Sequence, residues 1–145
     1  MPAKNRKQFQ LSFAELVDRL SIDQIKMIML PRLRKSMSRE VAQIAHDLEI
    51  IMKAKKIKLS AALIGKVISL TQINLHIWNL KEKMQEDKKQ YTKFLKRAHQ
   101  LNGIRNRIKN SLLKEERNFS QANIRTNAEV DSLKGWEDYF SFGAK

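Results

Sequence analysis

The sequence predicts an all-α fold: a helical bundle of about four main helices followed by a C-terminal aromatic tail. Two observations lead to this prediction. The 145 residues contain only four Gly and two Pro, so little interrupts long helices. Apolar residues recur at i, i+3 and i+4 along most of the chain, which is the period of an amphipathic helix. With 42% apolar residues, one domain of this length can bury a real core.

The first two helices are predicted from caps and apolar stripes. Ser12 is followed three residues later by Glu15, the spacing of a capping box, and Pro31 predicts an end near Leu30. The second helix is expected to follow a basic connector over residues 32–39, with Ser38 as its N-cap. The expected stripe of the first helix consists of Phe13, Leu16, Val17, Leu20, Met27 and Ile28.

The third and fourth predicted helices differ in character. The third begins after Ser60 and extends to Met84 or beyond. Its first 20 residues include one charge, Lys66, so we expect it in the middle of the bundle or at an interface of a homo-oligomer. The fourth, roughly 88–117, is basic with a narrow apolar seam. The expected domain limits are 1–118 for the bundle, with 1–11 as a flexible basic arm, and 119–145 for a tail that docks or bridges subunits.

The charge of the chain is its strongest functional signal. Its 29 Lys and Arg exceed its 15 Asp and Glu, giving a net charge of +14, and the excess is concentrated in residues 31–58 and 81–117. Such blocks favour a polyanion, nucleic acid first, bound by sequence-independent phosphate contacts. No zinc finger, RNP-type strand or helix-turn-helix signal accompanies them. The predicted polyanion-binding residues are Arg32, Arg34, Lys35, Lys53, Lys55, Lys56, Lys58, Lys88, Lys89, Lys93, Lys96 and Arg97.

Other function classes find little support in the sequence. The absence of Cys excludes disulfides and thiolate chemistry. The most apolar run, 63–80, contains too many polar residues for a membrane span, so a cytoplasmic protein is expected. The three histidines lack metal-ligand spacing, and neither a Ser/His/Asp arrangement nor a glycine-rich phosphate loop is present. We therefore expect a non-enzymatic binding or scaffold protein without catalytic residues, metal or cofactor.

Several polar residues fall on otherwise apolar faces. Asn102 and Arg105 lie within the seam of the fourth helix, and Asn74 lies on the apolar line of the third. Buried polar groups must be hydrogen-bonded, so these residues form either a network that fixes helix register or a pocket for a small anionic or polar ligand anchored by Arg105. Under the second alternative, Glu15 and Asp18 with acids from another helix would hold Mg²⁺, as in all-helical nucleotide pyrophosphohydrolases.

Three stretches of the chain resemble a known group of proteins. Residues 12–26 (SFAELVDRLSIDQIK), 73–84 (INLHIWNLKEKM) and 101–110 (LNGIRNRIKN) are similar, in the same order, to helices of a loose group of uncharacterised bacterial and phage proteins. Some members lie near genes of surface-glycan assembly, which implies a sugar-nucleotide or glycan context; the alternative function is a helical bundle that binds or acts on a nucleotide or sugar nucleotide. The resemblance implies the site residues Glu15, Asp18, Arg19, Lys26, Asn74, Trp78, Asn102, Arg105 and Asn106.

A third hypothesis concerns assembly. The segment from Phe119 onward is slightly acidic and ends in Trp136, Tyr139, Phe140 and Phe142. Such a tail is expected either to pack on its own bundle or to join neighbouring subunits. The second possibility would make the protein a structural assembly component.

Overall fold

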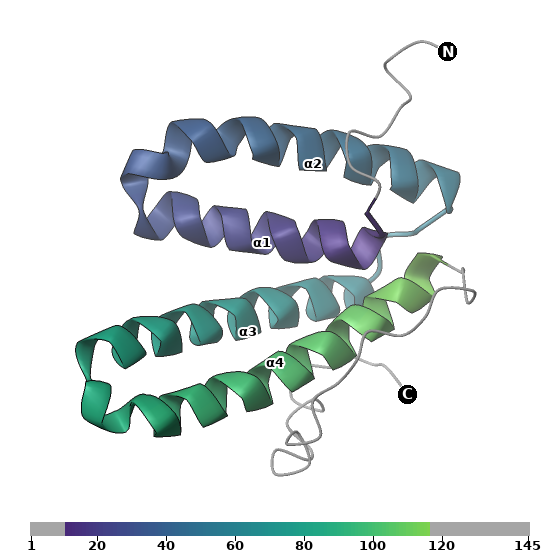
Figure 1. Cartoon of the computed structure of the whole chain (residues 1–145). Helices are drawn as coiled ribbons and strands as arrows, with labels where there is room; N and C mark the ends of the chain where they lie inside the picture. The colour runs from purple at the N-terminus through teal and green to yellow at the C-terminus, as the bar shows by residue number, and fades with distance from the viewer. Residues whose placement is uncertain (1–10, 117–145) are drawn as a thin grey trace.

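The described part of the protein, residues 11–116 of a computed structural model, is built from four α-helices and no strand (Figure 1). This confirms the all-α prediction. The helices are α1 (Phe13–Met29), α2 (Arg34–Ala54), α3 (Ala61–Glu86) and α4 (Tyr91–Leu113). Three short 3₁₀ turns accompany them: η2 (Pro31–Leu33), η3 (Lys88–Gln90) and η4 (Lys114–Glu116). The predicted basic arm, apart from Leu11, and the tail over 119–145 lie outside the described residues.

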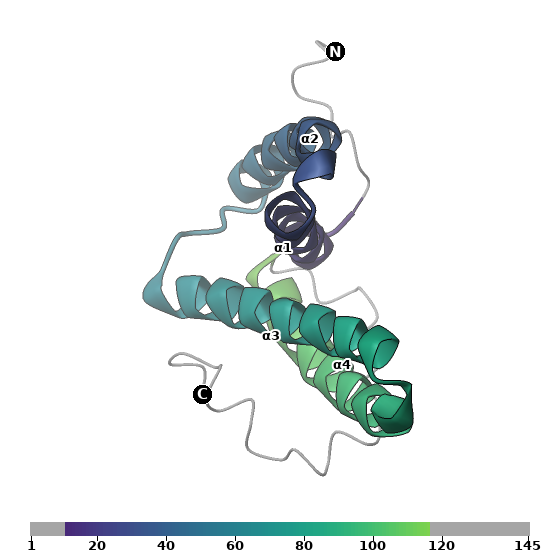
Figure 2. The ribbon, with the colours of Figure 1, turned by 90° about the vertical axis from the view of Figure 1, so that its left-hand side faces the viewer.

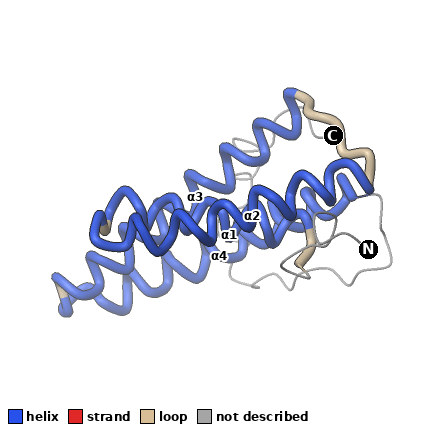
Figure 3. The backbone as a smooth tube through the Cα atoms, turned by 90° about the horizontal axis from the view of Figure 1, so that it is seen from above, coloured by secondary structure: helices blue, strands red, loops and turns tan. Residues whose placement is uncertain are grey.

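The helices form two antiparallel hairpins, α1–α2 and α3–α4, that meet through α1. Helix α1 packs against α2 on one side and against both α3 and α4 on the other. Figure 2 views the molecule toward the two hairpin turns, with α1 between α2 and the lower hairpin. In the view from above, the described chain is almost entirely helical with short connections (Figure 3). Helix α1 is therefore the central element that holds the hairpins together.

The hydrophobic core lies where α1 rests on α3 and α4. Leu70, Leu101, Ile104 and Leu112 are completely buried, and Phe13 closes the core from the start of α1. Burial of apolar surface at this junction is the main stabilising contribution. The core residues are Phe13, Ala14, Val17, Ile51, Ile57, Leu63, Leu70, Ile73, Ile77, Leu80, Ala98, Leu101, Ile104, Ile108 and Leu112.

The predicted helix starts are partly confirmed. Ser12 Oγ accepts from the Glu15 N–H at 3.1 Å, and Ser60 Oγ accepts from the Leu63 N–H at 3.1 Å, so both serines are N-caps. The prediction for Ser38 was wrong. Turn η2 continues directly into α2, so Ser38 lies inside the helix and donates to the Lys35 carbonyl at 2.8 Å.

Helix α2 ends in a left-handed cap formed by a lysine. Lys56 has φ 51°, a conformation in which glycine is more usual. The Ile57 N–H donates to the Met52 carbonyl at 2.9 Å, and the Ile57 side chain is buried in the core. This arrangement turns the chain out of α2 and toward α3.

Helix α3 is less enclosed than its composition predicts. Its outer face exposes Ile64 (43%), Ile68 (51%) and Leu75 (37%), so the expectation of a helix enclosed in the middle of this bundle was wrong. Ile28, expected on the buried stripe of α1, is 72% exposed because it lies in the last turn, near the end of the hairpin. None of the helices in residues 11–116 is long and apolar enough to cross a membrane.

Candidate nucleic-acid interface

A buried polar cluster joins α1, α3 and α4 around the carboxylate of Asp18. Arg105 donates to both of its oxygens, from Nε to Oδ1 at 3.0 Å and from Nη2 to Oδ2 at 2.5 Å. Asn74 donates its amide to Asp18 Oδ1 at 2.9 Å and to Ser21 Oγ at 2.6 Å. Lys109 Nζ lies 3.3 Å from Oδ2. Side chains from three helices thus converge on one carboxylate that is 3% exposed.

The charges within this cluster balance. Lys109 also pairs with Glu15, with 2.7 Å between Nζ and Oε1, so two cations face two carboxylates. Burial on its own would raise the pKa of Asp18, but hydrogen bonds from Arg105 and Asn74 and the charges of Arg105 and Lys109 outweigh it and lower the pKa. Burial likewise opposes the charge of Arg105, yet the contact with Asp18 raises its pKa. Both groups are therefore ionised at neutral pH.

The geometry favours a structural role for the polar cluster. Arg105 Nη1 donates to Asn102 Oδ1 at 3.0 Å, which orients the guanidinium toward Asp18. In the described chain, Asp23 Oδ2 is the only buried side-chain nitrogen or oxygen without a hydrogen-bond partner, and it lies outside the cluster. A closed network of this kind fixes the register of packed helices, because each helix must place its polar group opposite the others.

Three of the remaining predicted ligand residues, Arg19, Lys26 and Trp78, have positions or contacts outside this cluster. Arg19 pairs with Glu40 of α2 at 2.6 Å, and Lys26 lies in the last turn of α1. Trp78 Nε1 donates to Glu82 on its own helix at 3.0 Å. Asn106 follows Arg105 on α4 and is partly buried. Arg19 and Trp78 therefore take part in other contacts, and Lys26 lies at the far end of α1.

Sequence reasoning missed Lys109 and Ser21. Lys109 is 5% exposed, although lysine is among the residues least often buried. Its position could have been found by continuing the stripe of Asn102 and Arg105 by one turn, since residues 102, 105 and 109 share one helix face. Ser21 lies three residues after Asp18 and follows the same spacing on α1.

The carboxylates considered for Mg²⁺ are already paired with cations. Glu15 contacts Lys109, and Asp18 contacts both Lys109 and Arg105. Across residues 11–116, no three His, Asp or Glu side chains gather closely enough to hold a metal ion.

The predicted polyanion-binding residues lie on the surface. All are exposed except Arg97, which is partly buried. Over the described residues, none of the Lys and Arg side chains of 32–39, 53–58 and 88–96 pairs with a carboxylate. Their charged groups are therefore accessible to an external ligand.

The topology gathers two of the basic blocks at one end of the molecule. Turns η2 and η3 lie at the same end, so residues 32–39 and 88–97 do as well (Figures 1 and 2). We call the Lys and Arg residues of these two segments the basic end. The lysine cluster of 53–58 lies at the opposite end of α2. Basic positions far apart in sequence thus lie at the same end of the molecule.

Carboxylates near the basic end are engaged with other groups. Glu40 is paired with Arg19 on the α1–α2 hairpin. Asp87 Oδ1 accepts from the backbone N–H of Lys89 at 3.2 Å, and its Oδ2 accepts from the Gln90 amide at 3.0 Å. Glu40 thus pairs with Arg19 and Asp87 caps the turn, and within the described residues neither forms an ion pair with a Lys or Arg of 32–39 or 88–96.

A shallow hollow of about 380 Å³ marks the start of α2. It is lined by Arg32, Lys35, Ser36 and Arg39. The first turn of α2 contains no acidic residue, and Leu33 provides no side-chain cap. The positive end of the helix dipole therefore adds to the charge of three basic side chains.

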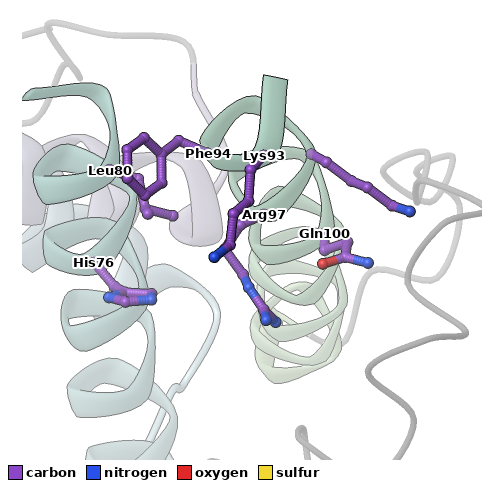
Figure 4. Close-up of a pocket in the computed structure, with 7 residues that line it drawn as sticks. His76, Leu80, Lys93, Phe94, Arg97 and Gln100 are labelled. Atoms are coloured by element: carbon purple, nitrogen blue, oxygen red, sulfur yellow. The ribbon is translucent and has the colours of Figure 1, made fainter. Parts of the chain in front are cut away.

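A second hollow, a groove of about 430 Å³, lies between α3 and α4 (Figure 4). Its cations are Lys93, Lys96 and Arg97 of α4. Its remaining lining residues are His76, Leu80, Phe94 and Gln100. Partial burial of the imidazole, followed by the charges of Lys83 and Arg97, lowers the pKa of His76, so this side chain is neutral at pH 7.

The resemblance found in the sequence stays a prediction. The structure brings five of its nine residues into the polar cluster: Glu15, Asp18, Asn74, Asn102 and Arg105. Comparison of the chain with family models, curated proteins and solved structures finds no match.

Proposed function

We propose that the protein is a non-enzymatic nucleic-acid-binding protein that uses its basic end to contact phosphates independently of sequence. The observation that supports this most is the convergence of residues 32–39 and 88–97 at one end, where the exposed Lys and Arg side chains of 32–39 and 88–96 pair with no carboxylate in the described chain. Clustered Lys and Arg on one surface are the electrostatic footprint of phosphate-backbone binding.

The distribution of the cations favours an extended polyanion over a small anion. One hollow lies on the α1–α2 hairpin and the other on the α3–α4 hairpin, and each is lined by three Lys or Arg residues. A single phosphate could contact the cations of only one of these hollows. A nucleic-acid backbone repeats its charge along its length and can contact both.

The alternative of a buried nucleotide or sugar-nucleotide site receives less support. Its central residues, Asp18 and Arg105, hydrogen-bond each other, and Lys109 neutralises the remaining carboxylate Glu15. A ligand would have to displace these contacts before it could bind.

The proposal is tested by fluorescence anisotropy with labelled nucleic acid of random sequence. We expect binding at about 50 mM salt that weakens steeply as salt is added, since phosphate binding releases counterions. The triple variants Arg32→Gln/Lys35→Gln/Arg39→Gln and Lys88→Gln/Lys89→Gln/Lys93→Gln should each weaken binding and reduce the salt slope by about 2 to 3.

The chain offers a matched control at its other end. Lys53→Gln/Lys55→Gln/Lys58→Gln removes the same number of charges from exposed positions at the far end of α2. This variant should bind nearly as well as the wild type. Absence of binding at low salt would overturn the proposal, and so would equal losses in the control and the basic-end variants.

A second candidate function, structural assembly, is favoured by one observation. Ile64, Ile68 and Leu75 form an exposed apolar stripe on the outer face of α3, which a second copy of the chain would cover. Ile64→Lys/Ile68→Lys should then convert an oligomer into a monomer in analytical ultracentrifugation. A wild-type protein that is monomeric at all concentrations would reject this function.

A further inference from the structure

We propose that the groove between α3 and α4 binds an unpaired nucleotide, so that the protein prefers single-stranded over double-stranded nucleic acid. This inference rests on the proposed function and specifies its substrate. The groove combines a concave shape, cations on one wall and an aromatic ring beside them, and together these suit one nucleotide of a single strand (Figure 4).

The cations of the groove are placed to hold phosphate. Lys93, Lys96 and Arg97 are spaced i, i+3 and i+4 on α4, so they share one face of that helix. Lys93 and Lys96 are exposed. No Asp or Glu is among the residues that line the groove, so nothing in its lining opposes the approach of a phosphodiester.

The apolar part of the groove, formed by Phe94 of α4 and Leu80 of α3, is suited to a base. The Phe94 ring lies beside Leu80, and both line the groove, which gives it an apolar surface against which a planar base can pack (Figure 4). Stacking on an aromatic side chain is tolerant of base identity, because every base has a π-face. This agrees with contacts that are independent of sequence.

Polar groups in the groove match the edge of a base. His76 is neutral at pH 7, because its partial burial and the nearby cations Lys83 and Arg97 lower its pKa, so its ring offers one donor and one acceptor. Gln100, which is 7% exposed, borders the groove beside it. The groove volume of about 430 Å³ falls in the range of small-molecule sites.

Base pairing determines which nucleic acid can use this groove. In a duplex the bases are stacked and paired, so they cannot enter a groove on a protein surface without being extruded. In a single strand the bases are free to turn outward and stack on aromatic side chains. A duplex would therefore contact the basic end through phosphates only, whereas a single strand would gain the groove contact as well.

The test compares a labelled 12-nucleotide oligouridylate with an RNA duplex of the same length by fluorescence anisotropy. We expect tighter binding of the single strand. Phe94→Leu, which retains an apolar side chain against the core, should weaken single-strand binding by about tenfold and leave duplex binding unchanged. Tyr91→Leu is the matched control, because Tyr91 is an exposed aromatic residue on the same helix that does not line the groove.

The possible outcomes separate this inference from the proposed function. If neither nucleic acid binds at low salt, the proposed function fails, and the inference fails with it. If both bind equally and Phe94→Leu changes neither, the groove inference is overturned while the proposed function stands. Equal losses in Phe94→Leu and Tyr91→Leu would also overturn the assignment to the groove.

A second measurement covers the case in which Phe94→Leu does not fold, as judged by circular dichroism. The wild-type protein is photocrosslinked to an oligouridylate that contains 4-thiouridine, and the linked peptides are identified by mass spectrometry. Crosslinks within 76–80 or 93–100 support the inference. Crosslinks confined to other segments overturn it.

Discussion

Two carboxylates of α1, Asp18 and Asp23, are each 3% exposed, yet their pKa values shift in opposite directions. Asp18 receives hydrogen bonds from Arg105 and Asn74, and its pKa is lowered. Asp23 Oδ2 has no hydrogen-bond partner within residues 11–116, and burial followed by the nearby charge of Glu40 raises the pKa of Asp23. At equal burial, hydrogen bonds and cations therefore stabilise the ionised carboxylate of Asp18, whereas burial and Glu40 oppose ionisation of Asp23.

The difference follows from the geometry of α1. Five residues advance an α-helix by about 140° around its axis, so Asp18 and Asp23 lie on different faces. Asp18 meets α3 and α4, where Arg105 and Lys109 provide two cations. Asp23 is close to Glu40 of α2, a carboxylate that already pairs with Arg19. The interface between the hairpins thus pairs its buried carboxylate with cations, whereas Asp23 in the α1–α2 interface lies close to a second carboxylate.

The largest predicted effect comes from removing Asp18. Asp18→Ala would leave Arg105 and Lys109 buried without their shared partner, and breaking a buried pair in this way costs about 3–5 kcal/mol. The free energy of unfolding, measured in urea by circular dichroism, should fall by that amount. Glu86→Ala, at an exposed position on α3, is the control and should change it by less than about 0.5 kcal/mol. A loss below about 1 kcal/mol in Asp18→Ala would contradict the role given to the cluster.

A smaller loss is expected from Arg105→Lys. The charge is retained, but an ammonium group cannot reproduce the two-pronged contact with both oxygens of Asp18. The loss of one charge-assisted hydrogen bond predicts a decrease of about 1.5–3 kcal/mol in the same urea experiment. Arg107→Lys on the same helix is the control, since Arg107 is not part of the cluster contacts around Asp18. Equal effects of the two substitutions would argue against the importance of the two-pronged geometry.

Asp23→Asn should raise the free energy of unfolding, whereas the two substitutions above lower it. It removes a buried charge that lies close to another carboxylate, Glu40, so the variant should be more stable than the wild type at pH 7 by up to about 1 kcal/mol. A decrease in the unfolding free energy would show that the charge of Asp23 is needed. In that case the contrast between the two interfaces would be wrong.

The smallest predicted effects are changes in the free energy of unfolding with pH, and they compare Asp18 with Asp23 directly. The pKa of Asp18 is lowered in the folded state, so its stabilising contribution is full above the ordinary aspartate pKa and is lost as the pH falls through the lowered value. The pKa of Asp23 is raised, so its contribution is full below the ordinary value and is lost as the pH rises through the raised value. Unfolding measured from pH 2 to 8 should show the difference between Asp18→Asn and the wild type shrinking as the pH falls below the ordinary aspartate pKa. The advantage of Asp23→Asn should appear as the pH rises, and parallel curves would contradict both assignments.

Periodicity predicted much of this architecture because local rules govern it. Ser12 and Ser60 start their helices as expected, since a cap depends only on residues a few positions away. Asn74, Asn102 and Arg105 were expected to meet polar partners because they interrupt apolar stripes, and they do.

Features that depend on the partner helix were harder to predict. Lys109, Asp23 and Asp47 are buried, although residues of these types are ordinarily exposed, and their burial follows from which face of each helix meets a neighbour. The exposure of Ile64 and Ile68 has the same origin. A helix rich in apolar residues on every face cannot indicate which face stays uncovered, so the position of α3 at the edge of the bundle emerged only from the structure.

The contact between the first and last described helical turns has a topological consequence. The Phe13 N–H at the start of α1 donates to the carboxylate of Glu116, so the helical region closes on itself like a ring. Two connections then join one hairpin to the other: residues 55–60 and the contact between Phe13 and Glu116. The chain can be opened at either one without dividing a hairpin. A circularly permuted chain that joins residue 116 to residue 12 and begins at α3 would keep both hairpins and every contact of Asp18.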